Sequence, residues 1–258
     1  MIDMHCHIVP GVDDGAKDME MSIEIARLYA NNGFKKIINT SHFLGEGKGI
    51  TRFDLEESFR RLNEQLEDEG IDLEVLPGNE LYMSMDIVND LESGRALTLN
   101  NSRYVLIELP SSDFPLYTED ILYELQIKGY KPIIAHPERN RRIISDPNLL
   151  VDLINKGNLA QMNYHSIEGM YGKDVMKTAD FLLKNRLFHF LGTDTHSNGR
   201  RSPNVSKIIK LIETKVGKDY LKELTVVNPT MVINNEEIEV EIKDIKKKAR
   251  LFNIFKVF

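Results

Sequence analysis

The sequence lacks several features that would assign it to other classes of protein. Cys6 is its only cysteine, which excludes an internal disulfide and any CxxC zinc site or redox pair. Basic residues do not outnumber acidic ones, and a formal net charge of -7 argues against general binding of nucleic acid or anionic lipid. No basic stretch followed by an apolar run opens the chain, and no stretch reaches the ~18 apolar residues of a membrane span. We therefore expect a cytoplasmic protein that acts on a small or locally presented substrate.

Short apolar runs alternate regularly with helical patterns along the chain. Its 258 residues suit one α/β barrel, and 41% of them are hydrophobic, so we expect a single domain over 1–258. Strands are predicted over 1–5, 36–40, 73–76, 104–109, 132–136, 159–163 and 187–192. Helices are predicted before Gly33, before Gly70, and over 117–128, 147–156, 173–185, 204–214 and 217–224. This α/β alternation with about seven parallel strands favours a TIM-like (β/α) barrel, whole or distorted, over an open sheet.

Most of the histidines lie where predicted strands end. Five of the seven share this position, and they are His5, His7, His42, His136 and His196. Glu80 and Asp194 also follow apolar runs. Because the carboxyl ends of parallel barrel strands open on one face, these side chains should converge there. Side chains two positions apart in a strand share a face, so His5 with His7, and Asp194 with His196, can each hold metal.

The same alternation separates Cys6 from its histidine neighbours. In M-I-D-M-H-C-H the cysteine lies between His5 and His7, so its side chain should point to the opposite face of the strand. A cysteine phosphatase also needs a phosphate cradle that ends in an arginine, and the corresponding position holds Val12. We therefore expect Cys6 to be a small buried apolar residue rather than a nucleophile.

Mixed imidazole and carboxylate ligands suit borderline divalent ions such as Mn²⁺, Fe²⁺, Co²⁺ or Zn²⁺, whereas an all-oxygen set would indicate Mg²⁺ or Ca²⁺. More than four candidate ligands imply more than one ion. Such a cluster can bind an oxyanion and activate water, as hydrolysis of a phosphate ester requires. Arg139, three residues after His136, could bridge two phosphate oxygens, and Arg200 or Arg201 is a second candidate.

Five other polar residues keep alternative roles. Spacing does not decide between Asp13 and Asp14 as a ligand. Asp3 shares a strand face with the first histidine pair, where it either orients a ligand or is a structural charge. We expect His165 to be an ordinary hydrogen-bonded histidine, with substrate contact as the alternative, and His189 to be a core or ligand-orienting residue.

Five motifs together resemble one known family. M-I-D-M-H-C-H, T-S-H, P-G-N-E, A-H-P-E-R-N and T-D-T-H occur in this order and are similar to the successive motifs of the polymerase and histidinol phosphatase (PHP) superfamily. Their spacing, the near-full-length coverage and the stretch L-Q-I-K-G-Y-K-P-I-I-A-H-P-E-R-N resemble its bacterial protein-tyrosine phosphatase branch, found with capsule and exopolysaccharide genes. The chain departs from the pattern at Ser41, where a proline often precedes the histidine. The arginine after the last motif aligns with either Arg200 or Arg201.

The resemblance implies a distorted barrel of the PHP type that holds three divalent ions, usually discussed as Mn²⁺. The implied ligands of the first ion are His5, His7, Glu80 and Asp194. Glu80 also bridges to a second ion, which His136 holds. The implied ligands of the third ion are Asp14, His42 and His196. A metal-bound hydroxide would attack phosphorus in line, Arg139 would neutralise the phosphoryl oxygens, and His42 could assist indirectly. The implied substrate is phosphotyrosine on the tail of a membrane-associated bacterial tyrosine kinase that regulates polysaccharide export.

Two rival functions and one further contact stay open. A small-molecule phosphatase such as histidinol phosphatase shares the cluster but differs in its pocket walls, and a non-catalytic metal-binding scaffold could dock on a kinase.

The stretch 239–258 ends in K-D-I-K-K-K-A-R-L-F-N-I-F-K-V-F and predicts a basic and apolar helical tail. We expect this tail to pack on the barrel, with peripheral contact to anionic lipid as the alternative.

Overall fold

A computed structural model of the chain describes residues 1–45, 47 and 51–242. Within them, nine strands pair in parallel in two sheets. The first sheet has the order β1-β2-β4, with bounds Ile2–Cys6, Lys36–Asn39 and Glu74–Leu76. The second has the order β3-β5-β6-β7-β8-β9, with bounds Ser41–Phe43, Asn79–Tyr82, Tyr104–Glu108, Lys131–Ala135, Leu159–Asn163 and Phe190–Gly192.

The two sheets join into one barrel because two strands of its wall are interrupted. Only Thr40 separates β2 from β3, and only Pro77 and Gly78 separate β4 from β5, so each pair forms one continuous stave. The circle closes where Cys6 of β1 pairs with Thr195, just after β9. Within the described residues, the wall therefore has the order β1, β2/β3, β4/β5, β6, β7, β8 and β9. This confirms the predicted distorted barrel of about seven strands.

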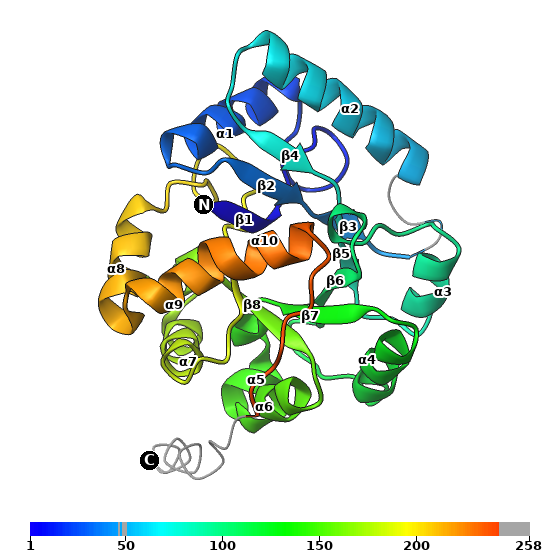
Figure 1. Cartoon of the computed structure of the whole chain (residues 1–258), viewed down its shortest axis with the longest axis vertical. Helices are drawn as coiled ribbons and strands as arrows, with labels where there is room; N and C mark the ends of the chain where they lie inside the picture. Colours follow the sequence, from blue (N-terminus) through cyan, green and yellow to red (C-terminus); the bar gives the residue numbers. More distant parts are fainter. Residues whose placement is uncertain (46, 48–50, 243–258) are drawn as a thin grey trace.

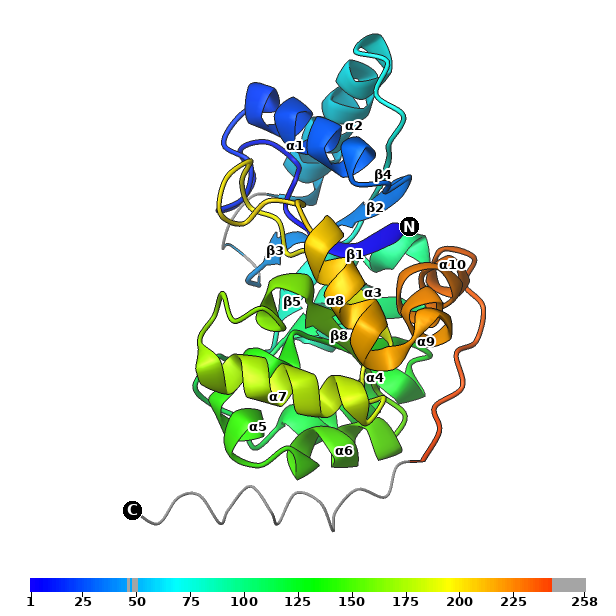
Figure 2. The same ribbon diagram turned by 90° about the vertical axis from the view of Figure 1, so that its left-hand side faces the viewer.

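Most of the helices lie around the outside of this wall (Figure 1, Figure 2). Their bounds are α1 Met19–Asn31, α2 Arg52–Asp68, α3 Ile87–Glu92, α4 Thr118–Ile127, α5 Arg141–Ser145, α6 Asn148–Asn155, α7 Lys173–Lys184, α8 Ser206–Val216, α9 Lys218–Lys222 and α10 Asn228–Ile233. Asp18 caps the start of α1, because its carboxylate accepts the Met21 N–H at 2.9 Å. The helix ends before Gly33, whose φ of 81° only glycine adopts easily. The predicted glycine stop of this helix is thus correct.

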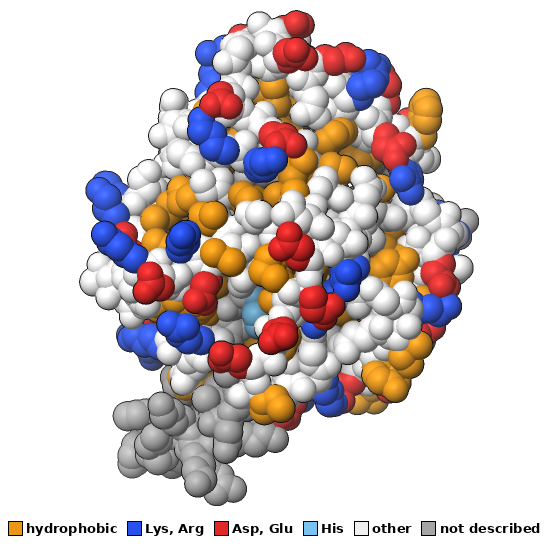
Figure 3. Space-filling model, viewed as in Figure 1, with side chains coloured by type: hydrophobic (Ala, Val, Ile, Leu, Met, Phe, Trp, Pro, Cys, Tyr) orange, Lys and Arg blue, Asp and Glu red, His pale blue; other side chains and the backbone are white. Residues whose placement is uncertain are grey.

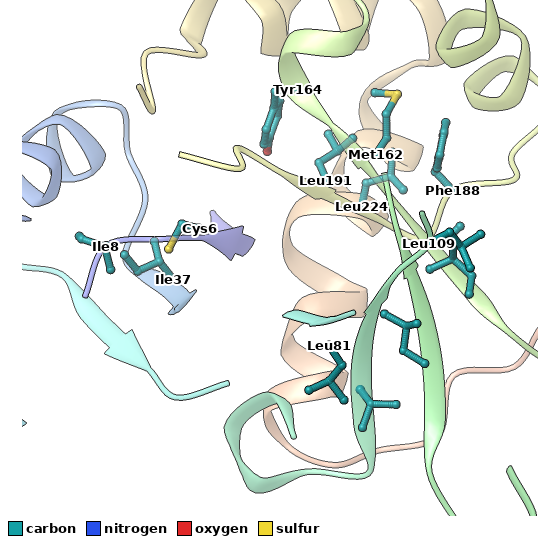
Figure 4. Packing of buried hydrophobic residues seen from close by; sticks show 14 of the residues in the cluster. Cys6, Ile8, Ile37, Leu81, Leu109, Met162, Tyr164, Phe188, Leu191 and Leu224 are labelled. Atoms are coloured by element: carbon teal, nitrogen blue, oxygen red, sulfur yellow. The ribbon is translucent and has the colours of Figure 1, made fainter. Parts of the chain in front are cut away.

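Apolar side chains fill two separate cores. The outer core lies between the wall and the helices and includes Cys6 and Ile37, which lie side by side in Figure 4. The inner core lies within the barrel and joins Met4 and Leu106 to Val232 of α10. α10 crosses the barrel beside the N-terminus of β1 in both ribbon views (Figure 1, Figure 2). It therefore covers the amino-terminal end of the barrel, opposite the end where the predicted site residues lie.

Several short elements were not predicted. α3, α5 and α10 are each six residues or fewer, and the predicted helix over 217–224 continues from α9 through a π-helical turn, Glu223–Val227, into α10.

In the predicted tail, 239–242 have no regular secondary structure and 243–258 lie outside the described residues, so the tail helix stays a prediction. Among the described helices, none is long and apolar enough to span a membrane. Basic and acidic side chains are interspersed over the face crossed by α10 (Figure 3).

Candidate metal centre

His5 and His7 meet at the carboxyl end of β1. Their Nε2 atoms lie 3.1 Å apart, and both residues are fully buried. Glu80 of β5 places its Oε2 atom 3.4 Å from His5 Nε2 and 3.6 Å from His7 Nε2, so the three donor atoms are close enough to share one ion. His5 Nδ1 lies 3.0 Å from the Oε1 atom of Gln161 in β8, a contact that leaves Nε2 free to bind metal.

A second group also includes the Glu80 carboxylate. His136, directly after β7, places Nε2 2.9 Å from Glu80 Oε1, and His42 places Nδ1 3.0 Å from Glu80 Oε2. Glu108, the last residue of β6, approaches His136 Nε2 to 3.9 Å and forms a further ligand group with His42 and Glu80. The sequence analysis missed Glu108, although it ends an apolar strand just as the predicted ligands do.

A third group lies at the edge of the cleft. It joins His7 to Asp14, His42 and His196, and the Asp14 carboxylate lies 3.4 Å from His42 Nε2 and 3.2 Å from His196 Nε2. Of the two adjacent aspartates, Asp14 is therefore the one that faces two histidines from other strands. The family resemblance implied Asp14 as a ligand, and that role stays a prediction.

Asp13 makes a different set of contacts. Its carboxylate accepts hydrogen bonds from His7 Nδ1 at 2.7 Å, from the His42 N–H at 3.0 Å and from the Gly15 N–H at 2.9 Å. A Cβ atom on Gly15 would lie 2.3 Å from the carbonyl oxygen of His7, so only glycine fits there. Asp13 thus orients His7 and fixes the loop that carries Asp14.

Asp194 connects the cluster to two arginines. Its carboxylate accepts hydrogen bonds or ion pairs from Arg139 at 2.8 Å, Arg201 at 2.6 Å and Asn163 Nδ2 at 2.7 Å. Arg200 is exposed and points instead toward the Met170 carbonyl oxygen, 3.5 Å away. Of the two predicted alternatives, Arg201 lines the cleft and Arg200 does not.

The backbone at two strand ends is strained. His136 and Asp194 have φ angles of 30° and 52°, which are rare for residues with a Cβ atom. Such conformations persist only where the surroundings hold them, and they gather at functional sites. Here each one turns a side chain from the end of a strand into the cluster.

Close packing of these groups shifts their pKa values in opposite directions. Burial lowers the pKa of His5, but the Glu80 and Asp194 carboxylates outweigh it and raise the value to about 9. The pKa of His42 also rises to about 9, because Glu80 outweighs its burial. Burial and Arg139 lower the pKa of His136 to about 4, and burial and His7 lower that of His196 to about 3. Without metal, His5 and His42 therefore favour the protonated form at neutral pH, because each lies among carboxylates.

Three of the other sequence candidates lie outside the cluster. His165 contacts the Glu168 carboxylate at 2.7 Å and the Ser202 carbonyl oxygen at 3.1 Å. His189 accepts the N–H of Ala160 at 3.2 Å. Asp3 does not share the face of His5 as predicted, because the pairing of β1 with β2 shifts register between Asp3 and Cys6. Its carboxylate accepts the Tyr29 hydroxyl of α1 at 2.6 Å, on the helix side of the wall.

The cluster opens into a cleft of about 460 Å³ at the carboxyl ends of the staves. Five carboxylates, three histidines, two arginines and three apolar side chains line it, and they are Asp13, Asp14, Glu80, Glu108, Asp194, His42, His136, His196, Arg139, Arg201, Val12, Leu44 and Tyr82. Cys6 is absent from this lining; it is fully buried in the outer core, and its thiol lies 3.4 Å from the Ile38 carbonyl oxygen. Burial raises the pKa of the Cys6 thiol well above its ordinary value, which disfavours a thiolate.

A parallel barrel with candidate metal-binding groups of histidine and carboxylate side chains at the carboxyl ends of its staves defines the class of this protein as an α/β barrel of the PHP type. The family described as "Capsular polysaccharide synthesis, CpsB/CapC" matches residues 1–234. The chain belongs to this family.

Similar proteins carry consistent names. The tyrosine-protein phosphatase YwqE of Bacillus subtilis is 36% identical over 99% of this chain and 100% of its own length. The tyrosine-protein phosphatase CpsB of Streptococcus pneumoniae is 31% identical over 92% of this chain and 100% of its own. A chain from the crystal structures of YwqE and CpsB, described as "unique metal-dependent tyrosine phosphatases", superposes with a TM-score of 0.90 at 36% identity, covering 95% of this chain and 98% of that one. These matches confirm the predicted resemblance and the predicted enzyme class, a phosphoric monoester hydrolase.

Proposed function

We propose that this protein is a metal-dependent protein-tyrosine phosphatase that removes phosphate from phosphotyrosine in protein substrates. The observation that carries the proposal is the meeting of three histidine and carboxylate groups with Arg139 and Arg201 in one cleft. The names of relatives that align over nearly the whole chain support phosphotyrosine as the substrate.

The residues of the cleft fit divalent cations. Five carboxylates face two guanidinium groups in the lining, so the side chains alone would repel a phosphate dianion. Donor atoms bound to one ion at about 2.1 Å lie roughly 3.0 to 3.4 Å apart. The distances among His5, His7 and Glu80, 3.1 to 3.6 Å, are close to that range. In addition, His42 Nδ1 is buried without a hydrogen-bond partner although Glu80 Oε2 is 3.0 Å away, which suits a shared cation.

We infer three ions, with Mn²⁺ as the first candidate and Fe²⁺, Co²⁺, Zn²⁺ or Mg²⁺ as alternatives. The ligands of the first ion would be His5, His7, Glu80 and Asp194. Those of the second ion would be Glu80, Glu108 and His136. Those of the third ion would be Asp14, His42 and His196. Ions bound there supply Lewis acidity for the phosphoryl oxygens and lower the pKa of water.

The remaining chemistry belongs to the arginines. Arg139 and Arg201 present planar donors to the cleft and would bind the phosphoryl oxygens as negative charge builds up in the transition state. The Arg139 guanidinium lies over the ring of Tyr171, 4.6 Å from the ring centroid. This contact holds the plane of the guanidinium group. Tyrosine leaves as a stable phenolate, so the cleft needs no strong general acid, and His42 contributes indirectly through its place in the cluster.

We further propose that the substrate is the phosphorylated tail of a membrane-associated bacterial tyrosine kinase that regulates capsule or exopolysaccharide synthesis, encountered in the cytoplasm. The description of the family, capsular polysaccharide synthesis, supports this partner. Incubating the purified protein with such a kinase in its phosphorylated form should release phosphate and remove the anti-phosphotyrosine signal. Retention of that signal under conditions that dephosphorylate a short phosphotyrosyl peptide would exclude the kinase as substrate.

The test of the catalytic function compares two substrates. Protein loaded with Mn²⁺ should hydrolyse a phosphotyrosyl peptide with a much higher kcat/KM than histidinol phosphate. The opposite preference would make it a small-molecule phosphatase. Absence of hydrolysis with any aryl phosphate would leave a metal-binding scaffold.

A further inference from the structure

Two exposed apolar side chains lie directly beside the metal ligands. Eleven large apolar residues are exposed among the described residues, and only Leu44 and Tyr82 of these line the cleft. Leu44 follows β3 and is 46% exposed, and Tyr82 ends β5 and is 40% exposed. Two exposed apolar side chains that line the wall of a cleft beside convergent polar groups suit contact with a ligand rather than a contribution to the core.

The position of these two residues relative to the ligands is regular. Tyr82 comes two residues after Glu80 in β5, and Leu44 comes two residues after His42, directly after the end of β3; these two strands pair with His42 opposite Glu80. Two residues advance a strand by about 6.6 Å and return the side chain to the same face. Because both side chains also line the cleft, Leu44 and Tyr82 form one layer next to the layer of metal ligands, on the same side of the wall.

We propose that Leu44 and Tyr82 form an apolar subsite that binds the aromatic ring of the substrate, whose phosphate is held by the ligand layer below. This inference rests on the proposed phosphatase function and names the part of the cleft that distinguishes an aryl from an alkyl phosphate. The arginines and this layer line the same cleft, so the leaving group of a phosphate ester bound at the arginines can reach it. A ring presents a face to both side chains, whereas the single methylene of phosphoserine cannot span them.

The test measures binding and turnover in Leu44→Ala and Tyr82→Ala of the full chain loaded with Mn²⁺. Each substitution should weaken binding of a phosphotyrosyl peptide with a non-hydrolysable phosphonate, measured by calorimetry, by about tenfold. The inhibition constant of inorganic phosphate, which has no ring, should stay within about twofold of the wild-type value. Tyr82→Phe keeps the ring and should recover most of the affinity that Tyr82→Ala loses. Leu211→Ala, on α8 and 39% exposed, is the matched control.

The outcomes separate the subsite from the function on which it rests. Unchanged peptide affinity in both alanine variants, with an active wild type, would overturn the subsite alone. An equal loss of affinity for peptide and inorganic phosphate would also overturn it, because the damage would then lie in the phosphate site. A wild-type protein that hydrolyses no phosphotyrosyl peptide would overturn the proposed function and the subsite together.

Discussion

Glu138 offers the sharpest quantitative prediction about stability. It is fully buried beside the cluster, where its Oε1 atom accepts hydrogen bonds from the Ser166 hydroxyl at 2.7 Å and the Asn163 N–H at 3.0 Å, while Oε2 has no partner. Burial raises the pKa of Glu138 from 4.5 to about 7. The folded state therefore binds the proton more tightly than the unfolded chain. This tighter binding of the proton adds about 3 kcal/mol to the free energy of unfolding below pH 4.5, and the added stability is lost as the pH rises to 7.

Glu138→Gln mimics the protonated carboxyl and removes the pH dependence that Glu138 gives to the stability of the protein. The free energy of unfolding of variant and wild type, measured by denaturant titration with a chelator present, should diverge by about 2 kcal/mol in favour of glutamine between pH 5.5 and pH 8. Glu67→Gln, on the exposed face of α2, is the control, because its carboxylate is solvated in both states. A difference between Glu138→Gln and wild type that stays constant over this pH range would refute the reasoning.

Other substitutions test the roles of individual side chains. Cys6→Ser should leave phosphatase activity nearly intact while His136→Ala abolishes it, and the reverse result in an assay with Mn²⁺ would restore the cysteine as nucleophile. Asp13→Asn should weaken Mn²⁺ binding about 10- to 100-fold, measured by titration, through loss of the contact that orients His7; an unaltered affinity would show that the contact is incidental. Arg139→Lys should lower kcat about a hundredfold, because lysine cannot bridge two oxygens, whereas Arg200→Ala should have no effect; equal effects would contradict the separate placement of the two arginines.

The fold was largely predictable because strand periodicity survives in every stave. All seven predicted strands are present, but sequence could not show that two of them break, because the breaks at Thr40 and at Pro77–Gly78 depend on how neighbouring staves pair. Periodicity also could not locate α3, α5 or α10, since helices of five or six residues are too short to display a repeat.

The site was predictable to the extent that ligands lie at strand ends. The same rule would have found Glu108, which was overlooked because acidic residues are common and this one has no histidine beside it in the sequence. The face of Asp3 was predicted wrongly because a local irregularity in β1 changes the alternation, and such irregularities depend on pairing with β2. The choice between Arg200 and Arg201 depends on the turn after His196, which strand periodicity does not describe.

The central claim is that the histidine and carboxylate cluster carries out hydrolysis by means of divalent ions. It is tested most directly by measuring phosphate release from a phosphotyrosyl peptide with chelator-treated protein as Mn²⁺ is added back. The account predicts negligible release without metal, and release that increases with Mn²⁺ up to saturation. Full release from protein shown by elemental analysis to be free of metal would contradict it.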